Sequence, residues 1–440
     1  MSRPRWTVEP GERFVPTAEQ ALAYVAPDGA FALYNDYARH ASVLVTGASP
    51  SLPTEVVAAW HGQLAGPVPR RLAPREAVEG YGTFTFPYGP ISMGVPESGR
   101  FDVVTYGERV LELVPLGGYK ARQVLTSLAG TSVEDAALCI ERIAGNVSAS
   151  HVAAFLAATE SARGTAVPLS ELWVRALAQE LQRIYNHVHV LARIAEAASQ
   201  NVGSAQSHAL AEEVLRMQGR AFGHRWLFGA LLPGGPPRRL DAADRKALGE
   251  TLLRWAKEFD ELWELFLDSR TFIDRIQSTC PVPREVAVRW GGVGPTLRAS
   301  GVRWDDRLRA PTAPYNDLFL ALPEERDGDA LARMLVRVQE VRASLLLIEQ
   351  MLDRWATASG ALVPAAPPVG PNRGLGRVEG PSGDVVYDVT LAGDKVSDIS
   401  ARTPSQANWP LFAFGMRDAV FTDFHFALES FGLVFAETDR

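Results

Sequence analysis

The chain of 440 residues, 47% hydrophobic and 22% charged, can bury a large core, and this excludes a disordered protein. Its formal net charge of −7 gives no overall basic surface, which argues against a nucleic-acid partner. Cys139 and Cys280 are its two cysteines, so a disulfide framework is excluded and a reducing, cytoplasmic compartment is predicted. We expect no secretory signal and no membrane span, because no run of about 18 apolar residues occurs.

The first part of the chain predicts two small units. Residues 1–80 combine Ala and Pro with short apolar runs, and we interpret them as a small N-terminal lobe and linker. Residues 82–113 alternate apolar and polar side chains between Gly and Pro turns, which is typical of half-buried strands. A helix is then predicted from Ser132 to about Ser161, because Ser132 and Asp135 resemble a capping box.

A helical body is predicted from about residue 170 onward. The helix that starts at Ser170 carries an apolar stripe with spacings of four, three, four and three, formed by Leu177, Leu181, Ile184, Val188 and Leu191. Further helices are predicted over about 208–230, 241–278 and 329–357, the second of them capped by Asp241. After the Gly-rich residues 290–301, a loop region that passes through Tyr315 is predicted.

The last part of the chain predicts strands and a short helix. The segment "GDVVYDVTLAGDKVSDISAR" predicts a β-hairpin with its turn at residues 392–394. A short closing helix is predicted after it. The predicted fold class is therefore α+β, a mainly α-helical body built as a long helix bundle with small peripheral β-sheets. We expect residues 81–440 to form one domain.

Several separated segments then point to a known family. They are, in chain order, "YGPISM", "IERIAGNVSASHVAAFLAATE", "VPLSELWVRALAQELQRIYNHV", "GVGPTLRASG", "GDALARMLVRVQEVRASLLLIEQ", "GRVEGPSGD", "PSQANWP" and "ETDR". Together they resemble the large-subunit superfamily shared by nickel-iron hydrogenases and the 49 kDa component of respiratory complex I. The formate hydrogenlyase and hydrogenase-4 branch is the nearest. The resemblance implies a hydrogenase large-subunit-like fold, and fold alone does not fix activity.

In the hydrogenase members of this family, four cysteine thiolates hold nickel and iron. Carried over by position, these ligands fall on Ala144, Val147, Val434 and Glu437. Such a centre requires soft thiolates, which Ala and Val cannot replace and a carboxylate replaces poorly. Cys139 stands nearby, and we interpret it as a small buried hydrophobe. The resemblance therefore implies a large-subunit homologue that holds no metal, and a nickel-iron hydrogenase is disfavoured.

In the complex I members, the corresponding cavity receives a quinone head group. Its tyrosine contact corresponds here to Gly145, and its histidine contact falls in the loop 115–122, on Gly117. Tyr119 and Lys120 of that loop are candidate substitutes, since a phenol can donate to a quinone carbonyl and a lysine can stabilise a reduced anion. Two expectations stay open, namely a quinone-type cavity and an empty or structural one.

Two charged positions of the first ligand segment keep the family's residues. Arg142 is either a cavity-wall arginine or, as we favour, a buried guanidinium paired with Glu141 or Glu160. His151 could relay protons near neutral pH, but a hydrogen-bonded core histidine is the commoner case and is the one we favour.

Structural or proton-path roles are expected for residues of other matching segments. These candidates are Glu180, Arg183, His187, Arg298, Glu379 and Asp439. Spacings of three and four on a helix allow charges to pair. His187 and His189 should point to different faces, so they do not form a metal pair. No catalytic residue is assigned from the sequence.

By resemblance, the chain would belong to a membrane-associated complex related to complex I and to energy-converting hydrogenases. Its expected partners are a small iron-sulfur subunit, which would carry the cluster, and antiporter-like membrane subunits. The chain itself would bind no cofactor apart from quinone at the cavity, and whether it acts as part of an enzyme of the NADH-quinone oxidoreductase type stays open. We expect a cytoplasmic location, peripheral on the inner face of the cell membrane. The alternative is a purely structural coupling component.

Overall fold

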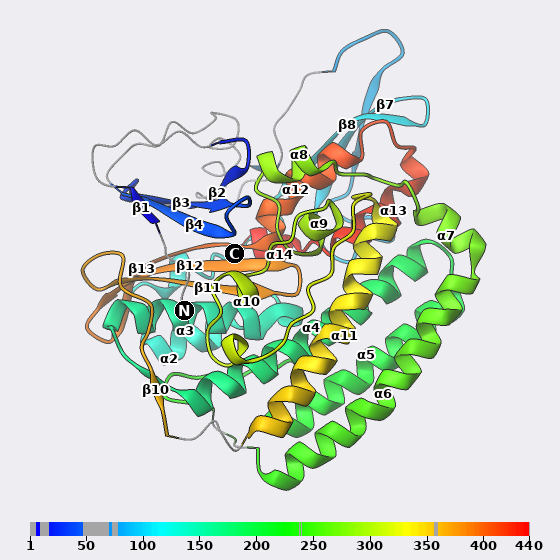
Figure 1. The fold of residues 1–440 in the computed structure, drawn as a ribbon. Coiled ribbons are helices and arrows are strands. Elements are labelled where there is room, and N and C mark those ends of the chain that lie inside the picture. Colours follow the sequence, from blue (N-terminus) through cyan, green and yellow to red (C-terminus); the bar gives the residue numbers. More distant parts are fainter. Residues whose placement is uncertain are drawn as a thin grey trace.

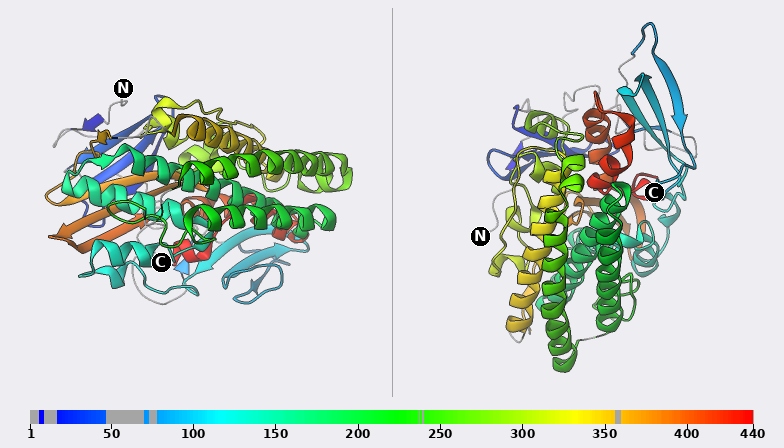
Figure 2. Two further views of the ribbon diagram at one scale, coloured as in Figure 1. Left: turned by 90° about the horizontal axis from the view of Figure 1, so that it is seen from below. Right: turned by 90° about the vertical axis from the view of Figure 1, so that its right-hand side faces the viewer.

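The computed structural model describes residues 6–8, 17–46, 70–72, 78–236, 238, 240–355 and 360–439. Its centre is a set of long helices that run side by side, as Figures 1 and 2 show: α4 (Leu169–Ala197), α5 (Asn201–Phe222), α6 (Ala242–Asp268) and α11 (Ala330–Arg354). The five apolar residues predicted to form the stripe of α4 are all buried. The predicted α+β class with a mainly helical body is confirmed.

Side-chain caps define where three of the helices begin. Asp241 accepts from the backbone N of Asp244 at 2.7 Å and completes a capping box at the start of α6. Asp329 caps α11 by accepting from the backbone N of Ala332 at 2.7 Å. Ser132 accepts from the backbone N of Asp135 at 3.1 Å and opens α2 (Val133–Ile140). Capping therefore fixes these helix starts as the sequence indicated.

The helix predicted from Ser132 to Ser161 is two helices, so that prediction is wrong. After α2 the chain turns through η2 (Gly145–Val147) into α3 (Ser148–Arg163). The guanidinium of Arg122 donates to the carbonyl oxygens of Arg142, at 2.9 Å, and Ile143, at 2.5 Å. These bonds replace the helical partners of both carbonyls, so the break is stabilised by a residue about twenty positions earlier.

Helix α3 packs against a three-stranded sheet ordered β11 (Arg373–Gly380), β12 (Gly383–Ala392) and β13 (Lys395–Arg402). In Figure 1 this sheet lies between α3 and a second sheet of the N-terminal region. The predicted hairpin is present as β12 and β13. Gly376 of β11 lies so close to the backbone of Ala154 and Ala158 that a Cβ would not fit, which explains the glycine.

The N-terminal sheet is ordered β1 (Trp6–Val8), β4 (Ala41–Thr46), β3 (Phe31–Asp36) and β2 (Gln20–Val25). Some of its buried side chains, among them Phe31 and Leu33, share one hydrophobic cluster with Leu375 and Val386 of the neighbouring sheet. Tyr24 Oη donates to Asp388 Oδ2 at 2.9 Å. The described part of the N-terminal lobe is therefore packed onto the main body.

A further antiparallel sheet contains β5 (Arg70–Arg71), β8 (Arg109–Gly117), β7 (Arg100–Tyr106) and β6 (Phe84–Tyr88), in that order. The β-region predicted over 82–113 is thus correct, and Figure 2 shows its hairpin projecting from the body. Strand β5 comes from the predicted linker and pairs with β8. The loop after β8 leads to the C-terminal segment described below.

Short elements connect these layers. They are η1 (Thr126–Leu128), β9 (Val167–Pro168), α7 (Arg270–Ile276), α8 (Arg284–Arg289), α9 (Gly294–Ala299), α10 (Asp306–Arg309), η3 (Tyr315–Asp317), β10 (Leu362–Val363), α12 (Pro404–Gly415), η5 (Phe421–Asp423), α13 (Phe424–Phe431) and α14 (Phe435–Thr438). The loop region predicted after residue 301 contains the short helices α10 and η3, and α5 begins and ends several residues before the predicted 208–230. Within the described ranges no helix is both long and apolar enough to cross a bilayer.

Candidate functional site

The two segments that would carry metal ligands in a hydrogenase meet in the structure. Ala144, Val147 and Glu437 are buried, and Val434 packs against the hydrophobic cluster that contains Ala144 and Val147. His151, one turn after Val147 on α3, places its Nε2 3.2 Å from Oε1 of Glu437. Segments from opposite ends of the main body therefore line one small region.

The carboxylate of Glu437 is held by other side chains of this region. Its Oε2 accepts from the hydroxyl of Ser405, and that same hydroxyl oxygen accepts from the backbone N of Val434 at 3.0 Å. On the other side, His151 Nδ1 lies 2.9 Å from Tyr387 Oη. Because buried polar groups are costly when unpaired, this hydrogen-bonded chain stabilises the C-terminal segment against α3.

The residues present do not fit a nickel-iron centre. Three of the four ligand positions carry hydrocarbon side chains, and the fourth is a hard carboxylate engaged by His151 and Ser405. Cys280 is buried elsewhere, and burial raises the pKa of its thiol to about 12. Cys139 is exposed on α2, so its prediction as a buried hydrophobe is wrong. Among the residues that the structure describes, no group of three or more His, Cys, Asp or Glu is arranged to hold a metal ion.

The segment 115–122 lies against the end of the same C-terminal segment, and its residues 115–117 belong to strand β8, so the predicted loop begins only after Gly117. The backbone N of Lys120 donates to Asp439 Oδ2 at 2.9 Å. A Cβ on Gly117 would lie 2.7 Å from Asp439 Oδ1, so this glycine permits the close approach. Tyr119 and Lys120 are half-buried. Asp439 thus joins the loop to the segment that carries Glu437, whereas Arg440 lies outside the described residues.

Arg142 and Gly145 stand on the outer side of this region. The side chain of Arg142 is 61% exposed and lies 3.6 Å from Glu141, so the prediction of a buried guanidinium is wrong although the predicted partner is present. Its guanidinium stacks on the ring of Phe228 at 4.8 Å. A Cβ on Gly145 would lie 3.6 Å from Phe228 and 3.9 Å from Trp226, so these aromatic rings cover the glycine.

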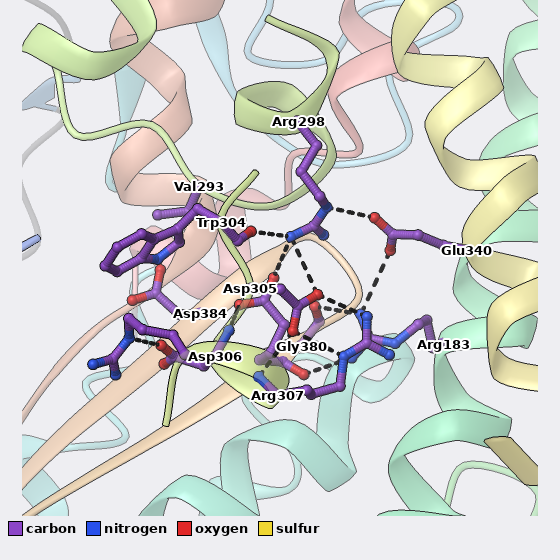
Figure 3. A network of polar contacts seen from close by, with 12 residues as sticks. Arg183, Val293, Arg298, Trp304, Asp305, Asp306, Arg307, Glu340, Gly380 and Asp384 are labelled. Atoms are coloured by element: carbon purple, nitrogen blue, oxygen red, sulfur yellow. Dashed lines mark hydrogen bonds and ion pairs between the residues drawn. The ribbon is translucent and has the colours of Figure 1, made fainter. Parts of the chain in front are cut away.

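Five of the six predicted charged candidates belong to one buried ionic network, part of which is drawn in Figure 3, and Asp439 lies outside it. Arg298 of α9 is its centre: Nε donates to Glu340 at 2.7 Å, and Nη1 donates to Glu379 at 2.9 Å and lies 3.4 Å from Asp305. Burial disfavours charge on Arg298, but Glu340 and Glu379 outweigh burial and raise its pKa. A single guanidinium therefore neutralises carboxylates from three different elements.

Two further arginines complete this network. Arg183 of α4 donates to the backbone carbonyls of Glu379, at 2.7 Å, and Gly380, at 2.9 Å, and so holds the turn between β11 and β12. Arg307 donates to both oxygens of Glu180 at 3.1 Å and also pairs with Asp305. Burial would raise the pKa of Glu180, but Arg307 and Arg183 lower it below its usual value.

His187 connects this network to the C-terminal end of α13. Its Nε2 lies 2.8 Å from Glu340 Oε2, and Arg337 Nη1 lies 3.1 Å from its Nδ1. Arg337 also donates to the carbonyl oxygen of Phe431 at 2.8 Å. Since an arginine only donates, Nδ1 is the acceptor and the hydrogen is on Nε2. His189 instead stacks on Tyr185, so the two histidines face different neighbours as predicted.

The burial of His187 predicts a loss of stability in acid. Burial lowers its pKa from 6.5 to about 4, so between these values the unfolded chain binds a proton that the folded chain does not. The free energy of unfolding should therefore fall as pH decreases from 6.5 to about 4. Replacement by glutamine, His187→Gln, should remove about 3 kcal/mol of this loss. Urea unfolding across this range measures the effect, and exposed His40→Gln should keep the wild-type slope.

Sequence reasoning missed several members of the site. Asp305, Arg307, Glu340, Tyr387 and Ser405 all make buried contacts in it. The run "WDDRLR" was the available signal for the first two, because it places four charged residues within six positions. Glu340 gave a second signal, since it interrupts the core-facing side of α11 next to apolar neighbours. Neither signal shows which carboxylate meets which guanidinium.

The geometry defines a mainly helical protein in which the positions predicted to correspond to the metal ligands lie together and carry no thiolates. Comparison with known proteins agrees with the predicted family. The family model described as "Respiratory-chain NADH dehydrogenase, 49 Kd subunit" matches residues 207–372. Membrane-bound hydrogenase subunit alpha of Pyrococcus furiosus is 26% identical over 317 residues, 69% of this chain and 74% of that protein. An NADH-quinone oxidoreductase subunit of Roseiflexus sp. is 27% identical, over 78% of this chain and 94% of that protein.

A solved structure shows the same fold. A chain of the membrane-bound sulfane sulfur reductase, an archaeal respiratory membrane complex, superimposes with a TM-score of 0.75 over 82% of this chain and 99% of that chain, at 22% identity. With the sequence matches, this confirms the predicted resemblance to the superfamily shared by nickel-iron hydrogenase large subunits and the 49 kDa component of complex I.

Proposed function

We propose that this protein is a metal-free large-subunit homologue that acts as a coupling component of a membrane-associated, complex I-like assembly. The observation that carries the proposal is the pairing of Glu437 with His151 and Ser405. At the positions where relatives of the hydrogenase type would place metal ligands, this chain places a carboxylate satisfied by its own hydrogen bonds. Such a site favours a structural and electrostatic role over redox chemistry on a resident metal.

The proteins that this chain resembles support its proposed membership of a membrane-associated assembly. One is a subunit of a membrane-bound hydrogenase, and the structural neighbour comes from a respiratory membrane complex. We infer that this chain docks peripherally on the inner face of the cell membrane, together with antiporter-like membrane subunits and a small iron-sulfur subunit. The segment 115–122 and the C-terminal segment form the face proposed for the iron-sulfur partner, because half-buried Tyr119 and Lys120 lie there beside the segment that carries Glu437.

A quinone pocket is the second candidate function. It is favoured by the position of the segment 115–122, whose Tyr119 and Lys120 stand beside the segment that carries Glu437. In this version, electrons would pass from a cluster in the partner to a quinone held by the segment 115–122. The phenol and the ammonium group would hydrogen-bond the head group and stabilise the reduced anion.

Purification of the assembly tests the first proposal. An affinity-tagged chain, extracted from membranes in mild detergent, is expected to copurify with an iron-sulfur protein and polytopic membrane proteins in fixed ratios. Lys120→Glu should reduce the recovery of the iron-sulfur protein at least tenfold, whereas Arg326→Glu, at an 87% exposed side chain, should leave recovery unchanged. A chain that is recovered alone from membranes under these conditions would contradict the proposal.

The same preparation separates the two candidates. When its iron-sulfur clusters are reduced and a short-chain quinone is added, electron paramagnetic resonance follows their reoxidation. The coupling role predicts that Tyr119→Phe leaves the rate unchanged. The quinone pocket predicts a loss of about tenfold or more, since a hydrogen bond to a charged intermediate is worth about 1.5 to 3 kcal/mol.

A further inference from the structure

The carboxyl group of Glu379 is the least neutralised acid of the buried network. Glu340 contacts Arg298, Arg183 and the ring N–H of His187. By contrast, Glu379 Oε1 accepts from Arg298, which it shares with two other carboxylates, and Oε2 accepts from the backbone N of Asp306 at 3.2 Å. Its side chain is 1% exposed, so water does not supply the missing stabilisation.

Charged groups from every surrounding element face Glu379. They are Arg183 of α4, Arg298 of α9, Asp305 and Asp306 at the start of α10, Arg377 of β11 and Asp384 of β12. Arg183 binds the backbone carbonyl of Glu379 at 2.7 Å. Arg377 pairs with Asp306 and Asp384. Three carboxylates therefore surround Glu379 while most of the cations are engaged elsewhere.

We propose that Glu379 is a proton-binding site, at which the side chain holds a proton at neutral pH and releases it in mildly alkaline solution. The step is a simple exchange in which the carboxylic acid loses its proton to solvent and becomes a carboxylate, with no change of oxidation state. Burial, together with Asp305, raises the pKa of Glu379 to about 8, in agreement with the geometry.

The turn after Glu379 contacts segments that lead to the former ligand region, which is formed by Ala144, Val147, Val434 and Glu437. Glu379 and Gly380 end β11, and a Cβ on Gly380 would lie 3.2 Å from the hydroxyl of Ser150, the residue before His151. Across the same turn, Ser382 Oγ donates to the carbonyl oxygen of Gly432 at 3.4 Å, just before Val434. A negative charge on Glu379 therefore appears next to the turn between β11 and β12. This turn stands between the ionic network and the former ligand region. Proton binding at Glu379 does not depend on the proposed assembly.

Infrared difference spectroscopy on the purified full chain tests the proposal. Between about pH 6 and about pH 10, the wild type should lose the C=O stretch of one protonated carboxyl group. Glu379→Gln should lack this titrating band and release one proton fewer per chain in a potentiometric difference titration. Glu97→Gln is the matched control, since Glu97 is another acid whose pKa burial raises, and it should keep the band assigned to Glu379. A band that survives in Glu379→Gln would overturn the proposal.

The wild type alone provides a test if Glu379→Gln does not fold. Labelling the glutamates with carbon-13 should shift the titrating band to lower frequency, as expected for a glutamic acid. Finding no titrating carboxyl band in the wild type, or one that the label does not move, would equally overturn the assignment.

Discussion

Replacing Arg298 by methionine is expected to destabilise the protein by about 3 to 5 kcal/mol or to prevent folding. The guanidinium is fully buried and binds carboxylates of Glu340, Glu379 and Asp305. Without it, these acids remain in the core with fewer cations, and their desolvation is no longer offset. Urea unfolding followed by circular dichroism measures the loss. Arg298→Lys should recover only part of it, because one ammonium cannot reach several carboxylates in the planar geometry of a guanidinium.

The control for this substitution is Arg326→Met, whose side chain is 87% exposed and 3.9 Å from Glu324. It should change the free energy of unfolding by less than about 0.5 kcal/mol. A loss below about 1 kcal/mol for Arg298→Met would mean that the buried network contributes little to folding.

Replacing Gly376 by alanine is expected to cost about 3 kcal/mol or more. The new Cβ would point at the carbonyl oxygen of Ala154 and the backbone N of Ala158, so relief requires helix α3 to move away from β11. Backbone atoms cannot rotate aside as a flexible side chain can. Because α3 carries His151, the contact between His151 and Glu437 should weaken as well.

Thermal unfolding of Gly376→Ala provides the measurement. Gly80→Ala is the matched control, since its nearest neighbour would be Thr83 at 3.7 Å and the expected change is within about 0.5 kcal/mol. Equal melting temperatures for the two variants would contradict the close packing of α3 on β11.

The sequence predicts those parts of the fold that local chemistry determines. The caps at Ser132 and Asp241, the apolar stripe of α4 and the hairpin near residue 393 depend on side chains within a few positions of one another. The break after α2 was missed because its cause is Arg122, which satisfies two carbonyls from another element. Local patterns do not contain such a contact.

The same distinction between local patterns and contacts from distant elements applies to the candidate site. Resemblance indicated the segments around Ala144 and Glu437, and the structure brings them together through His151. It did not indicate that Arg142 would be exposed, because a charged side chain at a helix end has the same local pattern whether it faces inward or outward. Nor could it indicate that Arg298 serves three carboxylates, since these lie on α11, on β11 and before α10.

The nickel content of the assembly, purified from its native membranes, decides whether the proposed metal-free state is correct. A chain with Ala144, Val147, Val434 and a hydrogen-bonded Glu437 at the ligand positions should contain no nickel above background, while iron and acid-labile sulfide appear with the partner. Elemental analysis that finds one nickel atom per chain, retained after exhaustive treatment with a chelator, would show that these residues do hold the metal and that the proposed function is wrong.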